Sequence, residues 1–503
     1  MPEPAGDAEF TFSGSPVDFP EEWQEQGPNG LRLKADKRKN VPRRVEVAPD
    51  GVVAAGGRPC WFIPGKFGFC LNCGEMPAGQ AREFNKLATL SAEGRSSATT
   101  LLVSSALRWM NQMGSRIPKD KRKPLGFTDN RQDAALQAGH FNDFVFVSLL
   151  RAATLAALRK ADVAGLGDGE IGARTQEALG FKSSSQRRRV EWMLDPDFKG
   201  VAQLNADKAI AKVLWYRVWS DQRRGWRYTN PNLEELGLIA TQYLALNELA
   251  ADQAEFSAAP RELRDAPAAT RRDAYMVLFD AMRRSLAVST EVLDGVVLDQ
   301  IGNESRQSLR ELWTIGQQER KRTASALMID APRREEAGLQ GEPLVLRAGS
   351  RSALAKKLNR TDFWGRRLVP DEYASVVKSM LDAAEHYGIV RLVPTVFERP
   401  GWRLAAEAAR FVAGTGRADG RKPNAYFTRL YETLADLLMA GGEGLFGFEG
   451  REHTAQVDQE RRVWREWRFR WGDDDRVRRA RRTTSCRFSS ARLRWSSAST
   501  FPP

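Results

Sequence analysis

The sequence predicts an α/β protein that joins part of a parallel sheet to a large mainly α-helical insertion and a small cysteine-containing β-rich segment. Three features of the 503-residue chain support this fold class. A short apolar run, a turn and a long helix-periodic segment follow one another over residues 125–160, as in one unit of an α/β domain. Residues 161–375 keep an almost wholly helical pattern. Residues 60–74 alternate aromatic residues with Gly, Pro and Cys, which is typical of short strands and tight turns.

The N-terminal region divides into two predicted segments. Residues 1–58 are rich in Pro, Gly and charged residues, so we expect an irregular lead-in rather than a separate domain. Residues 59–92 contain the aromatic and cysteine-containing insert.

The α/β domain is predicted to begin over residues 93–160. We expect a first helix near 99–113, a strand at 125–127 and a long helix over 131–160. Asp129 stands directly before the long helix, where its carboxylate can cap the free N–H groups of the first turn.

Three further segments follow. Residues 161–375 are predicted to be a helical insertion. Residues 376–420 contain a helix and then two short strands, which resembles a winged-helix module. Residues 421–475 are predicted to contain a helix at 426–438 and a strand at 445–448, and to complete the α/β domain.

Composition indicates a soluble cytoplasmic protein. No uninterrupted apolar stretch is long enough to cross a bilayer, and four cysteines do not make a disulfide framework, so we expect no membrane partner. The net charge of +13 would suggest a polyanion as partner, but residues 476–503 contain eight arginines and no Asp, Glu or Lys. Without this segment the charge falls to +5, so charge alone does not predict nucleic-acid binding.

The first informative motif is Leu125-Gly-Phe-Thr128-Asp129-Asn-Arg131-Gln132-Asp-Ala-Ala. It resembles the segment that opens the second RecA-like domain of bacterial DEAD/DEAH-box-type superfamily-2 helicases. The free N–H groups and the dipole of a helix N-terminus favour a phosphate, and Arg131 and Gln132 in the first turn can reach a nucleic-acid backbone. A surface turn with a good N-cap is the structural alternative for this segment.

The second motif is His453-Thr-Ala-Gln-Val, followed by Arg462-x3-Glu466-x2-Phe469 and a glycine. The same helicases carry a strand that ends near a His, followed by a helix with this spacing and then Gly. The structural alternative is an exposed ion pair between Arg462 and Glu466, with Phe469 as ordinary core.

The resemblance implies a second RecA-like motor domain whose two parts, residues 93–160 and 421–475, share one parallel sheet. It implies DNA or RNA as partner, with Thr128, Asp129, Arg131, Gln132, His453 and Arg462 facing the nucleic acid. ATP and Mg²⁺ are the cofactors of the family. The implied function is a fragment of an ATP-dependent helicase or translocase. The alternative is a non-catalytic nucleic-acid-binding or adaptor protein built on a helicase half.

Several elements of the family are missing from this sequence. ATP chemistry needs a Gly-x4-Gly-Lys-(Ser/Thr) loop and an Asp-Glu pair for Mg²⁺. The sequence has no such loop, and Asp371-Glu372 is better explained as a helix start. Gly167-x-Gly169-x-x-Gly172 follows a helix, so it does not predict a dinucleotide site. We therefore expect no ATP hydrolysis or unwinding by the chain alone, unless a separately encoded first RecA-like domain completes the motor.

The segment 476–503 is interpreted as a frameshifted, disordered tail. In the family, a strand with a Ser-Pro-Thr-x-x-x-Gly-x-Asp motif and an arginine-finger motif follow the glycine, and neither is present. With permitted codons, reading from the third base of codon 486 can give Pro-Val-Leu-Phe-Cys-Ser-Pro-Thr-Met-Glu-Leu-Gly-Val-Asp, which is similar to the missing strand motif.

Two further patterns have alternative explanations. Cys70-x2-Cys73-Gly is a common zinc knuckle, with Cys60 as third ligand and no obvious fourth; reduced cysteines packed under aromatic residues are the alternative. The stretch from Trp215 through Trp219 to residue 228 mixes aromatic and basic residues as single-strand binding sites do, but its helical spacing favours buried core.

Overall fold

The structure is a computed structural model of the chain. It describes residues 12–20, 23–27, 30–48, 51–65, 68–69, 71, 98–111, 116–118, 121–128, 131–183, 185–223, 230–331, 345–395, 397, 399–415, 424–442, 444–453, 457, 459–470 and 488–492.

Two compact units make up the chain. The first unit comprises residues 1–88, 244–289 and 325–408, and the second comprises residues 89–243, 290–324 and 409–503. Each unit thus contains three separate stretches of sequence. The insertion predicted at 161–375 is consequently divided between the two units.

The first unit is mixed α/β. Its helices are η1 Pro16–Asp18, η3 Arg38–Asn40, α6 Leu246–Ala251, α7 Arg261–Arg264, α8 Ala268–Arg284, α10 Ala353–Leu358, α11 Thr361–Trp364, α12 Pro370–His386 and η7 Ala406–Ala408. Its strands are β1 Gln24–Gly27, β2 Gly30–Leu33, β3 Arg43–Val47, β4 Arg58–Phe62, β7 Val288–Ser289, β8 Ala326–Met328, β9 Val345–Arg347, β10 Val390–Pro394 and β11 Pro400–Ala405.

The predicted helix and two strands near 376–420 form, but within a larger sheet. α12 precedes the antiparallel hairpin β10–β11, in which Val390 lies opposite Leu404. β11 also pairs with β7 and β8, and β8 with β9, so the described strands make a five-stranded mixed sheet. β7, β8 and β9 were not identified in the predicted helical insertion because strands of two or three residues are too short to show a periodicity.

The expectation of an irregular lead-in over residues 1–58 is corrected: the described residues of this region form strands and contribute to an aromatic cluster. β1 pairs with β2, and β3 pairs antiparallel with β4. The cluster combines lead-in residues with residues of the predicted insert: Phe12, Phe19, Trp23, Trp61, Phe69 and Leu71. The lead-in and the insert therefore share one small apolar core, which becomes visible only when residues distant in the sequence are brought together.

The second unit contains the two motif segments. Its helices are α2 Arg131–Lys160, α3 Asp168–Ala178, α4 Gln186–Trp192, α5 Gly200–Gln222, η5 Glu291–Leu293, α9 Gly295–Ser308, η6 Glu311–Trp313, α13 Ala425–Met439 and α14 Gln459–Arg470. Residues 98–110 are also helical. Its strands are β5 Leu125–Thr128, β6 Ile239–Tyr243, β12 Ala409–Ala413, β13 Gly450–His453 and β14 Phe488–Arg492.

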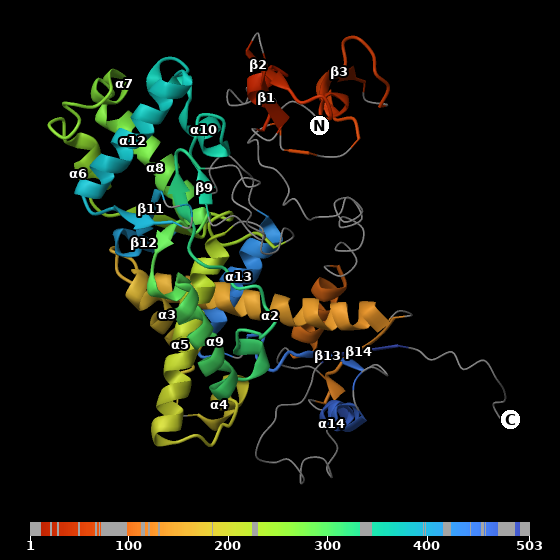
Figure 1. Ribbon diagram of the computed structural model, residues 1–503. Coiled ribbons are helices and arrows are strands. Elements are labelled where there is room, and N and C mark those ends of the chain that lie inside the picture. Colours follow the sequence, from red (N-terminus) through yellow and green to blue (C-terminus); the bar gives the residue numbers. More distant parts are fainter. Residues whose placement is uncertain are drawn as a thin grey trace. The chain divides into compact units, whose positions relative to one another are not determined.

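A small parallel sheet joins the two ends of the second unit. Its described strands have the order β13-β14-β5, and both pairings are parallel. The expectation that the two motif segments share one parallel sheet is therefore confirmed. Figure 1 shows β13 and β14 beside the long helix α2, which contacts both strands.

β14 corrects the prediction of a disordered tail for residues 488–492. Its sequence, Phe-Ser-Ser-Ala-Arg, lacks the run of β-branched and aromatic residues that identifies a strand. Pairing on both sides, with β13 and with β5, outweighs this weak local preference. The remaining residues of 476–503 lie outside the described residues.

A second correction concerns the predicted strand at 445–448, which is a turn. Gly444 and Gly447 have φ angles of +56° and +73°, and this left-handed conformation is incompatible with an extended strand. Leu445 and Phe448 are still buried, so these residues are apolar because they belong to the core and not because they form a strand. The strand itself begins at Gly450.

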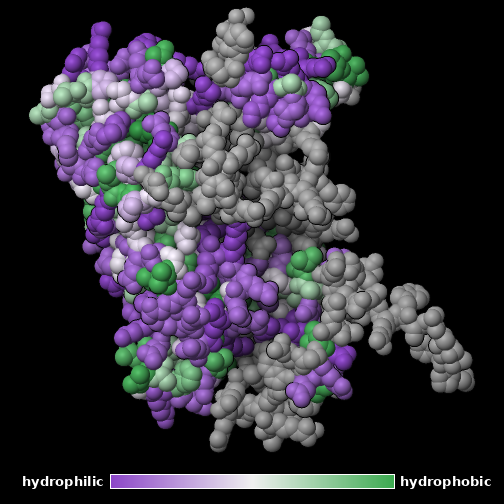
Figure 2. Space-filling model, in the orientation of Figure 1, coloured by the Kyte–Doolittle hydropathy of each residue, from purple (hydrophilic) through white to green (hydrophobic). Residues whose placement is uncertain are grey.

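α2 is the central helix of the second unit. Its 30 residues pack against α13 and α3, and Figure 1 shows it running through the unit. Asp133–Lys160 is apolar and long enough to cross a membrane, but the apolar window is 89% buried within the protein. Such burial is typical of a core helix in a soluble protein. Hydrophilic residues cover most of the described surface on the face that Figure 2 shows.

Two glycines of α3 give opposite expectations for the same substitution. A Cβ on Gly172 would lie 2.6 Å from the carbonyl oxygen of Ala211 and 2.6 Å from Cβ of Trp215, both on α5. A Cβ on Gly169 would meet nothing within 4 Å. We expect Gly172→Ala to lower the free energy of unfolding by about 1–3 kcal/mol through overpacking.

The matched control, Gly169→Ala, is expected to raise the free energy of unfolding by about 0.5–1 kcal/mol, because alanine loses less backbone entropy in a helix. Urea unfolding followed by circular dichroism measures both. Equal effects of the two substitutions would contradict the close packing of α3 on α5.

Candidate nucleic-acid interface

The carboxyl ends of β5 and β13 lie at the same edge of the parallel sheet. Ala491 of β14 lies opposite His453 of β13 on one side and opposite Phe127 of β5 on the other. β5 leads into α2 and β13 leads towards α14. In open α/β sheets, ligands bind outside the carboxyl ends of parallel strands, so this edge is the candidate site.

The backbone brings together most of the residues predicted to bind nucleic acid. Thr128 is the last residue of β5, and His453 is the last residue of β13. Arg131 and Gln132 are the first two residues of α2. Asp129, the predicted N-cap, lies outside the described residues.

Arg462, the sixth predicted residue, lies near the start of α14 and is half-buried. Its Nε atom is buried and has no hydrogen-bond partner among the described residues.

Side chains that the motifs did not indicate hold the elements around this edge. Asn142 of α2 exchanges two hydrogen bonds with the backbone of Gly450, where β13 begins. Arg465 of α14 donates to the carbonyl oxygen of Glu452 at 2.7 Å. Lys123, just before β5, donates to the carbonyl oxygen of Phe469 at 2.6 Å. No local sequence signal links Asn142 to Gly450 or Lys123 to Phe469, which lie far apart in the chain.

Charged residues in and beside β13 form a partly buried network. Arg451 pairs with Glu449 at 2.5 Å and with Glu311 at 2.8 Å. Burial acts to lower the pKa of Arg451, but Glu449 and Glu311 outweigh it and raise the pKa above its ordinary value. Burial lowers the pKa of Arg465, and the neighbouring Arg451 adds to this effect. The network favours a fixed position for β13.

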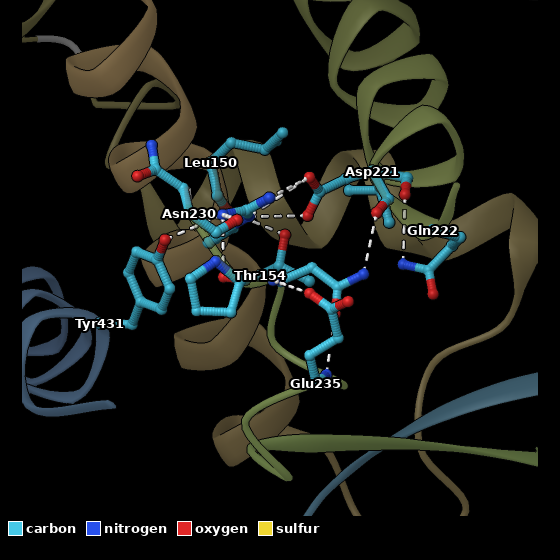
Figure 3. A network of polar contacts seen from close by, with 11 residues as sticks. Leu150, Thr154, Asp221, Gln222, Asn230, Glu235 and Tyr431 are labelled. Carbon is cyan, nitrogen blue, oxygen red and sulfur yellow. Dashed lines mark hydrogen bonds and ion pairs between the residues drawn. The ribbon is translucent and has the colours of Figure 1, made fainter. Parts of the chain in front are cut away.

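A second polar network lies within the helices of the same unit (Figure 3). Arg151 of α2 and Asp221 of α5 form a two-pronged ion pair, with Nη2–Oδ1 at 2.7 Å and Nε–Oδ2 at 2.9 Å. Their side chains are only 3% and 8% exposed. Nη1 of Arg151 also donates to the hydroxyl of Tyr431 at 2.8 Å and to the backbone carbonyls of Asn230 and Pro231.

Arg151 remains charged in this network. Burial acts to lower its pKa, but Asp221 and Tyr431 outweigh burial and hold the pKa above its ordinary value. The space beside the ion pair is a cavity of about 10 Å³, lined in part by Thr154 and Gln222. This volume is about that needed by one water molecule, so the network joins helices rather than binding a ligand.

The aromatic stretch around Trp215 belongs to the core where it is described. Trp219 is fully buried, and the indole N–H groups of Trp215 and Trp219 donate to Oδ1 of Asp168 at 2.5 and 2.6 Å. The hydroxyl of Thr290 donates to the same carboxylate. Residues 224–229 lie outside the described residues. The geometry favours the core interpretation over base stacking for these two tryptophans.

The predicted zinc ligands are only partly described. Cys60 is a half-buried free thiol in β4, whereas Cys70 and Cys73 lie outside the described residues. Among the residues that the structure does describe, no three His, Cys, Asp or Glu side chains gather closely enough to hold a metal ion.

Asp371 and Glu372 are confirmed as a helix start. They lie in the first turn of α12, where the carboxylate of Glu372 accepts a hydrogen bond from the N–H of Val369 at 3.1 Å. The same carboxylate pairs with Arg366, whose guanidinium holds the pKa of Glu372 below its ordinary value. This arrangement explains the acidic pair without Mg²⁺.

Comparison of the chain with protein-family models, with curated proteins and with solved structures gives no significant match.

Proposed function

We propose that this chain is the nucleic-acid-facing second motor domain of an ATP-dependent helicase or translocase. The observation that carries the proposal is the shared parallel sheet of β5 and β13, whose carboxyl ends lie at one edge. Thr128, Arg131 and His453 are thereby placed at that edge. The spacing of the two motifs and their meeting in space support the same interpretation.

The chemistry of this edge suits a phosphate backbone. The first turn of α2 presents backbone N–H groups at the positive end of the helix dipole, and Arg131 and Gln132 are part of that turn. Such contacts fix the position of a nucleic acid without reading its sequence. DNA and RNA are therefore both proposed partners.

The position of β14 supports a change of reading frame near the C-terminal segment. β14 lies between β13 and β5. It follows α14 in sequence, and in the family that the chain resembles the strand with the Ser-Pro-Thr motif also follows this helix. In the alternative frame, codons 487–492 can encode Val-Leu-Phe-Cys-Ser, a better strand than the printed residues. Sequencing the locus across codons 470–503 tests this directly, and an intact single frame would overturn it.

ATP and Mg²⁺ are expected to bind elsewhere. Residues 1–503 contain no Gly-x4-Gly-Lys-(Ser/Thr) loop, so the phosphate-binding residues would come from a first RecA-like domain outside these residues. We place the protein in the cytoplasm, where such a partner and nucleic acid meet. ATP hydrolysis stimulated by nucleic acid in the purified chain alone would contradict this division of labour.

If the proposal is right, the chain binds single-stranded oligonucleotides with an affinity that depends on salt. Arg131 should contribute to this affinity. Fluorescence anisotropy with a labelled oligothymidylate gives the slope of log K against log salt. We expect Arg131→Ala to reduce the magnitude of this slope by about 0.7, the value for one phosphate contact on a single strand.

Arg159→Ala is the matched control, because Arg159 lies at the other end of α2 and pairs with Glu432 and Asp436. It should leave the slope unchanged. Equal slopes for the two variants would show that the start of α2 does not contact the nucleic-acid backbone.

Salt-dependent binding that never supports ATP turnover, even with a first motor domain added, would favour the non-catalytic adaptor.

A further inference from the structure

Asn142 of α2 is matched to one residue of β13. Its Nδ2 donates to the carbonyl oxygen of Gly450 at 2.9 Å, and its Oδ1 accepts from the N–H of the same residue at 2.7 Å. One side chain thus satisfies both backbone groups of the first residue of the strand. His453, at the end of the strand, is three residues further on.

β13 needs such contacts because it is the terminal strand of the described sheet. A terminal strand leaves alternate backbone groups unpaired on its outer side. Gly450 and Glu452 are two residues apart, so their backbone groups point to the same side of the strand. Asn142 satisfies Gly450, and Arg465 of α14 donates to the carbonyl oxygen of Glu452 at 2.7 Å. Two helices therefore hold one strand.

We infer that Asn142 is a positioning residue, which fixes β13 and so holds His453 at the candidate interface. The inference rests on the proposed function, since it assigns a purpose to the position of His453. A short strand held at its first and third residues has little freedom to slide or rotate. The position of its last residue, His453, is then fixed relative to α2, because Asn142 and Arg131 both belong to this helix.

The chain offers a matched control for this contact. Asn359 makes the same two-way exchange with Leu368 in the first unit: its Nδ2 donates to the carbonyl oxygen at 2.9 Å and its Oδ1 accepts from the N–H at 2.8 Å. An Asn→Asp substitution keeps the shape at either site but replaces the donor with an oxygen that faces a carbonyl. Both variants lose the same hydrogen bond from Nδ2 to a backbone carbonyl oxygen, but only Asn142→Asp loses it at β13.

The test uses the full-length chain labelled with ¹³C at its histidines. The chain has three histidines, so three imidazole signals are expected, and loss of one signal in His453→Asn assigns it. We expect Asn142→Asp to shift the His453 signal and to weaken oligothymidylate binding about 10-fold, equivalent to one lost hydrogen bond. Asn359→Asp should leave the His453 signal and the affinity unchanged.

Arg465→Gln provides a second test if Asn142→Asp does not fold. It removes the hydrogen bond from Arg465 to Glu452 of β13 and should shift the same His453 signal. An unchanged His453 signal in a folded variant of Asn142 would overturn the inference, whatever happens to binding. A shifted signal in a protein whose wild type binds no oligonucleotide would uphold the positioning role and refute the proposed function.

Discussion

Replacing Arg151 with Met is expected to lower the free energy of unfolding by about 3–5 kcal/mol, which is the usual cost of breaking a buried ion pair by removing one partner. The substitution leaves the carboxylate of Asp221 buried without its cation. It also removes the donor to the hydroxyl of Tyr431 and to two backbone carbonyls. Urea unfolding followed by circular dichroism measures the loss.

Arg159→Met is the control on the same helix. Arg159 pairs with Glu432 and Asp436, whose side chains are 42% and 64% exposed, and such pairs contribute about 0–1 kcal/mol. The double variant Arg151→Met/Asp221→Leu should recover much of the stability, because it removes the isolated charge. A cost for Arg151→Met no larger than that for Arg159→Met would contradict the network in Figure 3.

Replacing Asp168 with Ala is the second large expected effect, a loss of about 3 kcal/mol in the free energy of unfolding. The carboxylate is the acceptor for the indole N–H groups of Trp215 and Trp219 and for the hydroxyl of Thr290. Alanine leaves these donors without an acceptor, at roughly 1–3 kcal/mol for each buried one. A change in tryptophan fluorescence should accompany the loss.

Asp168→Asn keeps an acceptor oxygen and is expected to retain most of the stability. It also tests the pH dependence. Burial raises the pKa of Asp168 above its ordinary value of 3.8, so the folded protein holds this proton more tightly than the unfolded chain. The part of the stability that is linked to this proton is fully present below pH 3.8 and is lost as the pH rises through the raised pKa, whereas the hydrogen bonds that the side chain accepts remain. The free energy of unfolding of Asp168→Asn should not show this decline with rising pH. Parallel pH profiles for the wild type and the variant would contradict the raised pKa of Asp168.

The sequence predicted the elements that have strong local signals. α2 follows from the apolar spacing of Ala134, Ala138 and Phe141 after a short apolar strand, and α13 follows from the same kind of pattern. α14 was expected from the resemblance to the helicase motif. The meeting of β5 and β13 on a parallel sheet was expected because the motifs resemble two parts of one domain. That expectation came from the resemblance, since no local pattern pairs strands so far apart.

The rest depends on contacts between distant residues. Asn142 and Arg151 look like ordinary polar interruptions of an apolar helix, and only the fold shows that their partners are Gly450 and Asp221. β14 has no strand-like sequence and forms by pairing on both sides. Arg151 illustrates the difference well: in the sequence it breaks an apolar run, whereas in the structure it joins three helices.

The parallel sheet also has a consequence for synthesis of the chain. β5 is made early, yet among the described strands its partner is β14, near the C-terminus. Until β14 has left the ribosome, the backbone groups of β5 lack their strand partner, and until α13 has left it the apolar face of α2 lacks that helix. Such intermediates aggregate readily, because unpaired strands and exposed apolar surface associate between molecules. Production of the protein should therefore respond to chaperone supply and to growth temperature.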